Sequence, residues 1–239
     1  MLGIRLWSFL IFIVIIARES FDSRAYIKQN VSYMSVWNLG DIKIILASQS
    51  PRRKQILEQM GLEFEIIVPV IPNEEEEYIV LDDVGGSLQR LADAKATSVS
   101  HANPSALVLG ADTVVVINGE VLGKPRSADD AARMLMRLAG RMHYVYTAIA
   151  ARCEKINFNC TALAETKVFF RNISKEDLEY YLAYEHYMDK AGAYAIQGKA
   201  MAFVDKIEGC FYNVMGLPVK ETINLIEEFM LRKGVRDVG

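Results

Sequence analysis

The fold is decided by residues 42–61, which read IKIILASQSPRRKQILEQMG. Residues 42–47 are almost entirely apolar and rich in β-branched side chains, a pattern that predicts a buried strand. Ser50 suits the N-cap of a helix, Pro51 its first helical position and Gly61 its end. The stretch therefore predicts a strand that leads through a short loop directly into a helix.

The loop between this strand and this helix combines several features of an anion site. Unpaired backbone N–H groups and the positive end of the helix dipole meet there, beside the guanidinium groups of Arg52 and Arg53. The loop is thus a candidate phosphate site, and the alternative is a plain helix cap with two solvated arginines. No aromatic residues are interleaved with the basic ones, so the stretch does not suggest nucleic-acid binding.

The rest of the chain alternates between strand and helix patterns. Asn118-Gly119 marks a tight hairpin turn, and Ser127 and Ser174 mark helix starts. Strands are expected at 64–71, 107–117, 144–153 and 161–170, helices at 87–100, 131–140, 178–188 and from Pro218 through Arg232, and a hairpin at 203–214 around Glu208-Gly209. Hairpins together with long helices predict an α/β fold with a mixed central sheet, and we expect one domain over residues 41–239.

Composition excludes several classes of protein. The 239 residues carry a formal net charge of -3, which argues against a nucleic-acid-binding surface spread over the molecule. Three cysteines are too few for a disulfide scaffold and too irregularly spaced for a zinc site, and the three histidines have no ligand spacing. The low cysteine count fits the reduced cytoplasm.

Residues 1–40 are expected to be an N-terminal extension of that domain. Their apolar segment, residues 6–17, would span only about 18 Å as a helix, which is short for a bilayer. A secretory signal or membrane anchor within residues 1–25 is one interpretation, and a dispensable extension upstream of Met34 is another. We expect membrane contact only if this segment is retained.

Two further clusters could carry chemistry. Asp112 and Thr113 follow Gly110 in the strand 107–117, and Lys124 follows the hairpin turn, so a carboxylate and an ammonium are expected near one another. Asp112 could hold Mg²⁺ or orient an attacking water, and Gly110 would let the backbone approach a ligand. Gln197, with both a donor and an acceptor, could read the edge of a base.

Taken together, these motifs resemble the Maf family of nucleoside triphosphate pyrophosphatases. The resemblance rests on six segments in order: 46–53 (LASQSPRR), 110–113 (GADT), 123–125 (GKP), 189–194 (DKAGAY), 196–198 (IQG) and 214–218 (VMGLP). It implies an α/β fold with two lobes around a cleft, a homodimer, and hydrolysis of a nucleoside triphosphate to the monophosphate and pyrophosphate with a divalent cation, Mg²⁺ or Mn²⁺. One departure is Ala195, where the family usually has Gly, and we expect the local turn to differ slightly.

The resemblance also implies roles for individual residues. Asp112 would be the proton acceptor and, with Glu74, a metal ligand. The other implied catalytic residues are Ser48, Arg53, Lys95 and Lys124. Arg52, Thr113 and Gln197 match the branch that acts on dTTP and UTP, and would set substrate specificity. The alternatives are a pyrophosphatase for purine or modified nucleotides, and a non-catalytic protein that senses nucleotides in division control.

Overall fold

A mixed seven-stranded sheet runs through the part of the chain that the structure describes. The structure is a computed structural model that describes residues 39–71 and 81–234, nearly all of them within the unit Gly40–Gly239. The strands are β1 (Ile44–Ala47), β2 (Glu65–Ile66), β3 (Leu107–Ile117), β4 (Glu120–Leu122), β5 (Met142–Cys153), β6 (Phe158–Phe170) and β7 (Val204–Glu208). Their order is β2-β1-β3-β5-β6-β7, with β4 paired to β3. β1 is parallel to β2 and β3, and the other pairs are antiparallel, so the expected mixed α/β fold is confirmed.

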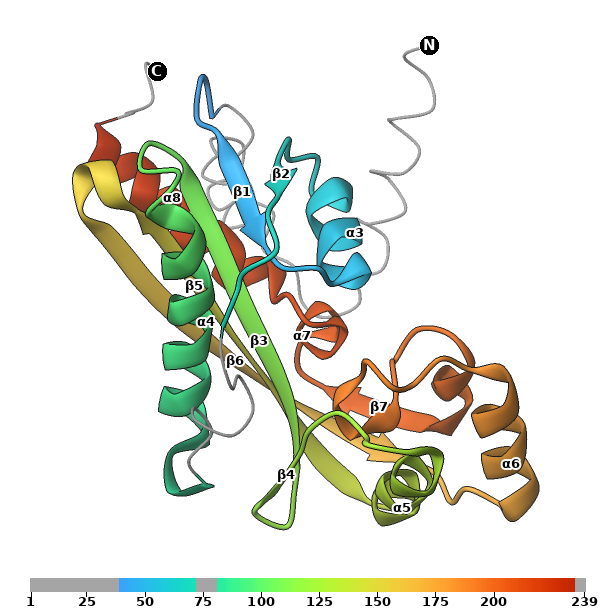
Figure 1. Ribbon diagram of the computed structural model, residues 1–239. Coiled ribbons are helices and arrows are strands. Elements are labelled where there is room, and N and C mark those ends of the chain that lie inside the picture. Colours follow the sequence, from blue (N-terminus) through green and yellow to red (C-terminus); the bar gives the residue numbers. More distant parts are fainter. Residues whose placement is uncertain (1–38, 72–80, 235–239) are drawn as a thin grey trace, which may run out of the picture. The chain divides into compact units, whose positions relative to one another are not determined.

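Helices cover both faces of this sheet (Figure 1). The α-helices are α3 (Pro51–Gln59), α4 (Val84–Ser100), α5 (Ala128–Leu138), α6 (Lys175–Tyr184), α7 (Phe211–Met215) and α8 (Val219–Lys233). Short 3₁₀ turns lie at Leu81–Asp83, Glu154–Ile156, Ala191–Ala193 and Lys199–Phe203. α4 packs against β3 and β5, and α8 packs against β5 and β6. The long strands β3, β5 and β6 continue past these helices to a second lobe with α5, α6 and β7.

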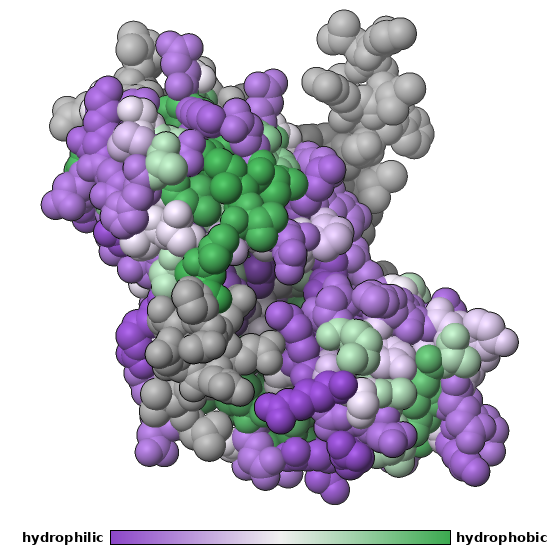
Figure 2. All heavy atoms as spheres, in the orientation of Figure 1, coloured by the Kyte–Doolittle hydropathy of each residue, from purple (hydrophilic) through white to green (hydrophobic). Residues whose placement is uncertain are grey.

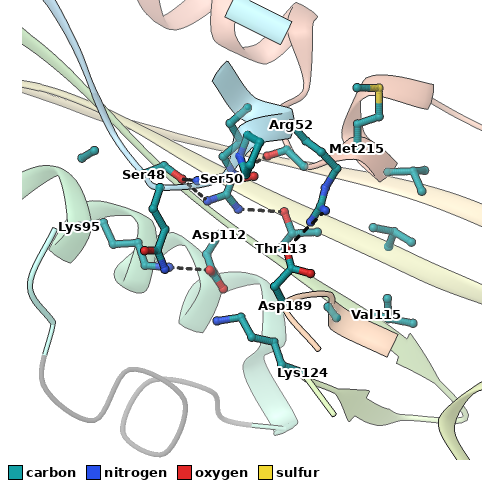
Figure 3. Close-up of a pocket in the computed structure, with 18 of the residues that line it drawn as sticks. Ser48, Ser50, Arg52, Lys95, Asp112, Thr113, Val115, Lys124, Asp189 and Met215 are labelled. Carbon is teal, nitrogen blue, oxygen red and sulfur yellow. Dashed lines mark hydrogen bonds and ion pairs between the residues drawn. The ribbon is translucent and has the colours of Figure 1, made fainter. Parts of the chain in front are cut away.

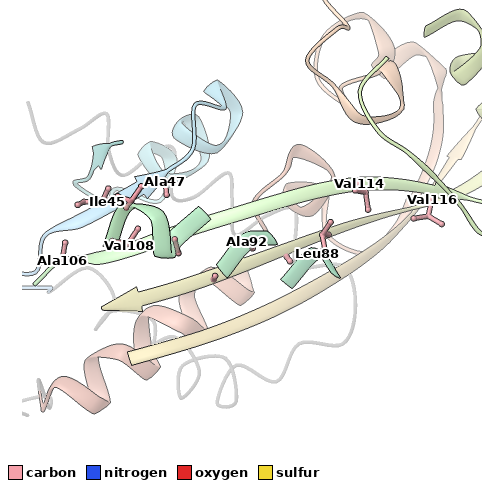
Figure 4. Close-up of a cluster of buried hydrophobic side chains, with 12 residues drawn as sticks. Ile45, Ala47, Leu88, Ala92, Ala106, Val108, Val114 and Val116 are labelled. Atoms are coloured by element: carbon pink, nitrogen blue, oxygen red, sulfur yellow. The ribbon is translucent and has the colours of Figure 1, made fainter. Parts of the chain in front are cut away.

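The core beneath α4 is built from small and β-branched side chains. Leu88, Ala92 and Ala96 of α4 belong to one cluster with Ile45 of β1 and Val108 of β3, all of them fully buried (Figure 4). Small residues on the buried face of α4 let the helix lie close to the sheet, so burial here fixes the spacing between helix and strand. On the surface, Ile66, Val68 and Val70 are exposed, and Figure 2 shows hydrophobic surface over that part of the molecule.

Most local signals in the sequence are confirmed. Ser127 and Ser174 accept hydrogen bonds from Asp130 N and Asp177 N, and Ser174 forms a complete capping box. Asn118 and Gly119 both have positive φ (52° and 78°), as the hairpin turn requires.

Three predicted elements are wrong in whole or part. The hairpin at 203–214 is strand β7 followed by helix α7, because tertiary hydrogen bonds from Asn213 Nδ2 to Val145 O and Thr166 Oγ1 hold this segment in a helical turn. The strand expected at 64–71 is paired only over Glu65–Ile66, and Pro69 has no N–H to donate to a ladder. The helix expected over 178–188 spans Lys175–Tyr184.

Some expectations fall on other parts of the chain. Residues 1–38 and the acidic run 74–77 lie outside the described residues. Within residues 39–71 and 81–234, no helix is long and apolar enough to cross a membrane.

Candidate active site

A gap in the strand pairing along one side of β3 places the candidate site. β1 pairs with β3 as far as Gly110, and β4 pairs with it from Val115 onward. Residues 111–114 therefore lie between the two, with β5 on their other side, and no strand of the described chain fills this gap. Because residues 48–50 follow the end of β1 and Lys124 follows the end of β4, both loops border the gap. A cavity of about 290 Å³ lies there.

The loop after β1 forms one wall of this pocket. Ser48 is buried, and its Oγ accepts hydrogen bonds from Ser50 N (3.2 Å) and Arg53 Nη1 (3.1 Å). Ser50 occupies the N-cap of α3, but its side chain makes no capping hydrogen bond. The start of α3 thus faces the pocket without a side-chain cap, which is the arrangement that favours an anion.

Lys95 and Asp112 meet at the base of the pocket (Figure 3). Lys95 Nζ lies 2.7 Å from Asp112 Oδ1, and the two side chains are only 8% and 18% exposed. Their low exposure and their positions on a helix and a central strand make this a stiff ion pair. Lys124 extends toward the same space from the loop after β4.

Gly110 has a structural role besides the one expected. A Cβ at this position would lie 2.3 Å from Ala92 O and 2.7 Å from Ala96 N, both in α4. The close approach that requires glycine is therefore that of helix α4, and an approach of the Gly110 backbone to a ligand stays a prediction. Gly110 still serves the site, because it sets the spacing between the two elements that carry Lys95 and Asp112.

Arg53 is the centre of a buried hydrogen-bond network. Its side chain donates to Gly216 O (2.8 Å) and to Thr113 Oγ1 (3.2 Å), besides Ser48. Thr147 Oγ1 donates to Asn213 O (2.9 Å), so the Thr113 hydroxyl must be the donor in its 2.9 Å bond to Thr147. The network fixes Arg53 and Thr113 against each other and against the segment that follows α7.

Arg52 and Asp189 line the open side of the pocket. Arg52 Nη1 lies 3.9 Å from Asp189 Oδ2, and Figure 3 shows the two side chains directed at one another. Burial raises the pKa of Asp189, but Lys190 and Arg52 outweigh this effect and hold the pKa below its ordinary value. The sequence alone indicates no separate role for Asp189, which is only the first residue of the segment 189–194.

The other end of the pocket is apolar. Val115, Val145, Val214 and Met215 line it together with Tyr194, whose ring is buried. The Tyr194 hydroxyl lies 2.8 Å from His143 Nε2, and both rings pack edge-on against Phe170. His143 is fully buried, and burial lowers its pKa to about 4, so it is neutral at pH 7.

The remaining predicted site residues lie elsewhere. Glu74 lies outside the described residues. Gln197 is partly buried but is not among the described residues that line the pocket, so its part in reading a base stays a prediction. Ala195 does not have a positive φ, whereas Gly192 and Ala193 do, so alanine at position 195 imposes no backbone strain.

A divalent cation would find a sparse set of protein ligands here. Among the described residues, no group of three His, Cys, Asp or Glu side chains could hold a metal ion. Mg²⁺ nevertheless does not need such a group, because it is commonly bound by one or two carboxylates together with water and the phosphates of a substrate. The Asp112 carboxylate fits that donor set.

The fold and the pocket define an α/β protein with a cationic cleft at the end of its parallel strands, suited to a polyphosphate. Residues 43–229 match the family of Maf-like proteins, and the chain belongs to this family. It is 43% identical over 187 residues to a dTTP/UTP pyrophosphatase of Symbiobacterium thermophilum, which covers 78% of this chain and 94% of that protein. It is also 42% identical over 190 residues to a dTTP/UTP pyrophosphatase of Bacillus velezensis, a match that covers 80% of this chain and 98% of that protein. A protein of the same name from Salmonella typhimurium is 44% identical over 195 residues, which cover 81% of this chain and 96% of that protein.

Proposed function

We propose that this protein hydrolyses dTTP and UTP to the corresponding monophosphate and pyrophosphate. The observation that carries the proposal is the Lys95–Asp112 pair at the base of a pocket whose wall is the start of α3, in a chain related to proteins named dTTP/UTP pyrophosphatase. The pocket joins a charged end to an apolar end, as a nucleotide requires.

The charged end would bind the triphosphate. Arg52 and Lys124 line it, and the uncapped start of α3 adds backbone N–H groups and the positive end of its dipole. The backbone N–H groups at the start of α3 are fixed by the fold before the substrate arrives, so they would also stabilise the negative charge that builds on the departing pyrophosphate. Arg53 would hold the loop through three of its five N–H donors, which serve Ser48, Thr113 and Gly216, and it lines the pocket where the phosphates would lie.

Asp112 would accept a proton from the attacking water. The water oxygen forms a bond to the α-phosphorus, the bond from that phosphorus to the bridging oxygen breaks, and the bridging oxygen leaves with its electron pair in pyrophosphate. Lys95, whose Nζ lies 2.7 Å from Oδ1, would hold the carboxylate in a fixed orientation toward the water. Asp112, Glu74 and phosphate oxygens would hold a divalent cation, Mg²⁺ or Mn²⁺, which when bound supplies positive charge and makes water more acidic.

The apolar end would receive the base. Its valines, Met215 and the Tyr194 ring offer packing to a small planar ring and leave discrimination to hydrogen bonds near the rim. Thr113 accepts a hydrogen bond from Arg53 and donates its hydroxyl proton to Thr147, so its oxygen could accept one more hydrogen bond from a base but could donate one only by releasing Thr147.

A panel of triphosphates tests the proposal directly. Pyrophosphate released from dTTP, UTP, dUTP, 5-methyl-UTP, CTP and purine nucleotides would be measured by ion chromatography, with and without Mg²⁺. We expect dTTP and UTP to lead and dUTP and 5-methyl-UTP to be accepted. A clear preference for purines would favour the alternative substrate class, and binding without pyrophosphate release would favour a nucleotide sensor.

We also propose, from the resemblance to the family, that the protein is a homodimer acting in the cytoplasm. Light scattering on the purified full-length chain measures the mass in solution, and a monomer would contradict the first point. Cell fractionation with and without residues 6–17 tests whether that segment brings the protein to a membrane.

A further inference from the structure

Asp189 is one of two carboxylates, with Asp112, in a pocket that also gathers several positive charges. Its two oxygens face two cations of different kinds. Oδ1 lies 2.7 Å from Nζ of Lys190, whose side chain is 9% exposed, while Oδ2 lies 3.9 Å from Nη1 of Arg52, whose side chain is 25% exposed. His186 Nε2 lies 3.6 Å from Oδ1 and is largely exposed. The carboxylate thus has one close, buried partner and one distant partner at the pocket.

The contact with Lys190 is complete without Arg52. Lys190 Nζ also donates to His186 O, so this buried ammonium is held by two oxygens from its own loop. Asp189 and Lys190 together are neutral, which means that Arg52 can leave without uncovering an unbalanced buried charge. The charge of Arg52 is therefore not required to neutralise Asp189, because Lys190 already does so.

The contact with Arg52 is weak by its geometry. At 3.9 Å it exceeds the 2.7–2.9 Å typical of a charge-assisted hydrogen bond, whereas a guanidinium can form two parallel hydrogen bonds to a phosphate. Arg52 belongs to α3 and Asp189 to the loop after α6, so the pair connects the two sides of the open pocket. A polyphosphate that enters there meets Arg52 next to a partner it can readily exchange.

We propose that Asp189 is a positioning residue, which holds Arg52 at the open side of the pocket and yields it to the incoming polyphosphate. Asp189 therefore competes with the ligand for Arg52 and recaptures the guanidinium when pyrophosphate leaves. It keeps the affinity of the site for polyphosphate below what its cations alone would give. The inference rests on the proposed function, because it assumes that a polyphosphate binds in this pocket.

A double-mutant cycle on the full-length chain tests this. Wild type, Asp189→Asn, Arg52→Gln and the double variant are titrated calorimetrically with inorganic tripolyphosphate in EDTA. We expect Asp189→Asn to bind about two- to fivefold tighter, the range that a partly exposed ion pair contributes. The gain should fall by at least half in the Arg52→Gln background. Asp189→Glu keeps the charge and should restore the affinity of the wild type.

Other results would overturn the proposal. Unchanged or weaker binding by Asp189→Asn would show no competition, and an equal gain with and without Arg52 would mean that Asp189 acts by its own charge. If the substitution unfolds the protein, a crystal structure of the wild type with tripolyphosphate decides: the Arg52–Asp189 distance should exceed 4 Å with Arg52 on a phosphate, and an intact pair would refute the exchange. Wild type that binds no tripolyphosphate would contradict the premise, whereas binding without dTTP hydrolysis would contradict the proposed activity alone.

Discussion

Two lysine–aspartate pairs border the same pocket and differ in how the chain holds them. Lys95–Asp112 and Lys190–Asp189 have the same 2.7 Å separation of nitrogen and oxygen. The first joins a helix to a central strand, and its carboxylate is 18% exposed. The second joins neighbouring residues of a loop, and its carboxylate is 46% exposed. The same kind of ion pair thus occurs once between two packed elements and once within an exposed loop.

The difference suggests a division of tasks. A group that must meet a reacting atom gains from elements whose own packing fixes it, whereas a group that releases a partner gains from exposure. The pair in the sheet, Lys95–Asp112, is therefore the one we associate with chemistry, and the pair in the loop, Lys190–Asp189, with handling of Arg52.

Asp112→Asn should have the largest effect. Loss of the proton acceptor is expected to lower the rate of pyrophosphate release from dTTP by about 10³-fold or more, since an amide cannot take a proton from water. The variant should still fold, because the amide keeps the size and most of the packing of the carboxylate, but its melting temperature should fall, since the buried Lys95 loses the negative charge of Asp112. Asp189→Asn is the matched control in the other pair and should retain turnover within about tenfold. Near-normal turnover by Asp112→Asn would remove Asp112 from the mechanism.

The two lysines should also differ. Lys95→Met is expected to lower kcat by about 10²-fold, the size of effect seen when a fixed charge at a reacting centre is lost. Lys190→Met changes a lysine of similar burial in the loop pair and should cost less than about tenfold in kcat. Steady-state kinetics on both variants measures the contrast, and equal losses would mean that the two pairs do not have separate tasks.

Gly110→Ala should disturb the pair in the sheet without touching either member. The added Cβ would meet Ala92 O at 2.3 Å, so α4 must move away from β3. Overpacking against backbone is expected to cost about 3 kcal/mol of unfolding free energy. Denaturant unfolding measures this cost. Gly110 does not have a positive φ, so the cost there comes from overpacking, whereas Gly119→Ala, where a Cβ meets nothing within 4 Å, measures the strain of positive φ without overpacking. Gly110→Ala should lower both stability and activity, because α4 carries Lys95, whereas Gly119→Ala should leave activity unchanged.

These cases also show what the sequence could and could not predict. Ser48, Asp112 and Lys124 line one pocket as the sequence suggests. Asp112 lies in the part of β3 that neither β1 nor β4 pairs with, Ser48 follows the end of β1, and Lys124 follows the end of β4. The place of Asp189 could not be read locally, since its segment is positioned by contacts such as Gly192 N to Gly123 O, far away in the chain.

The hairpin predicted at 203–214 failed for a similar reason. Its apolar and aromatic residues are compatible with a strand, but the hydrogen bonds of Asn213 to β5 and β6 decide for a helix. Gly110 was correctly singled out as a place of close approach, yet only the packing of α4 shows what approaches. Local patterns therefore predicted the elements, and long-range contacts decided how several of them are used.

The free energy of unfolding should fall in acid, because His143 anchors the segment that carries the Lys190–Asp189 pair. Residues 189–194 are anchored to the sheet where Tyr194 contacts His143, whose pKa is lowered to about 4 by burial. Above pH 6.5 both the folded and unfolded chains keep this histidine neutral. Between pH 6.5 and about 4 the unfolded chain takes up a proton that the folded one excludes, so stability falls as the pH falls.

The loss attributable to His143 is about 2 kcal/mol between pH 6.5 and 4.5. Urea unfolding at several pH values measures it. His143→Gln can still hydrogen-bond Tyr194 but does not titrate, so its stability should depend less on pH over this range. Parallel curves for the two proteins would assign the acid sensitivity to other groups.

Gln197 should have the smallest effect, because it lies outside the lining that both pairs share. If Gln197 stays outside this pocket when a nucleotide binds, Gln197→Glu is expected to change the ratio of kcat/KM for dTTP over CTP by less than about twofold, since its side chain would then have no hydrogen bond to the base to lose. Tyr194→Phe, at the apolar end, is the comparison and should change KM more than Gln197→Glu does. A large shift in base preference with Gln197→Glu would instead support the role that the family resemblance implies, and would require the segment 196–198 to move toward the pocket when a nucleotide binds.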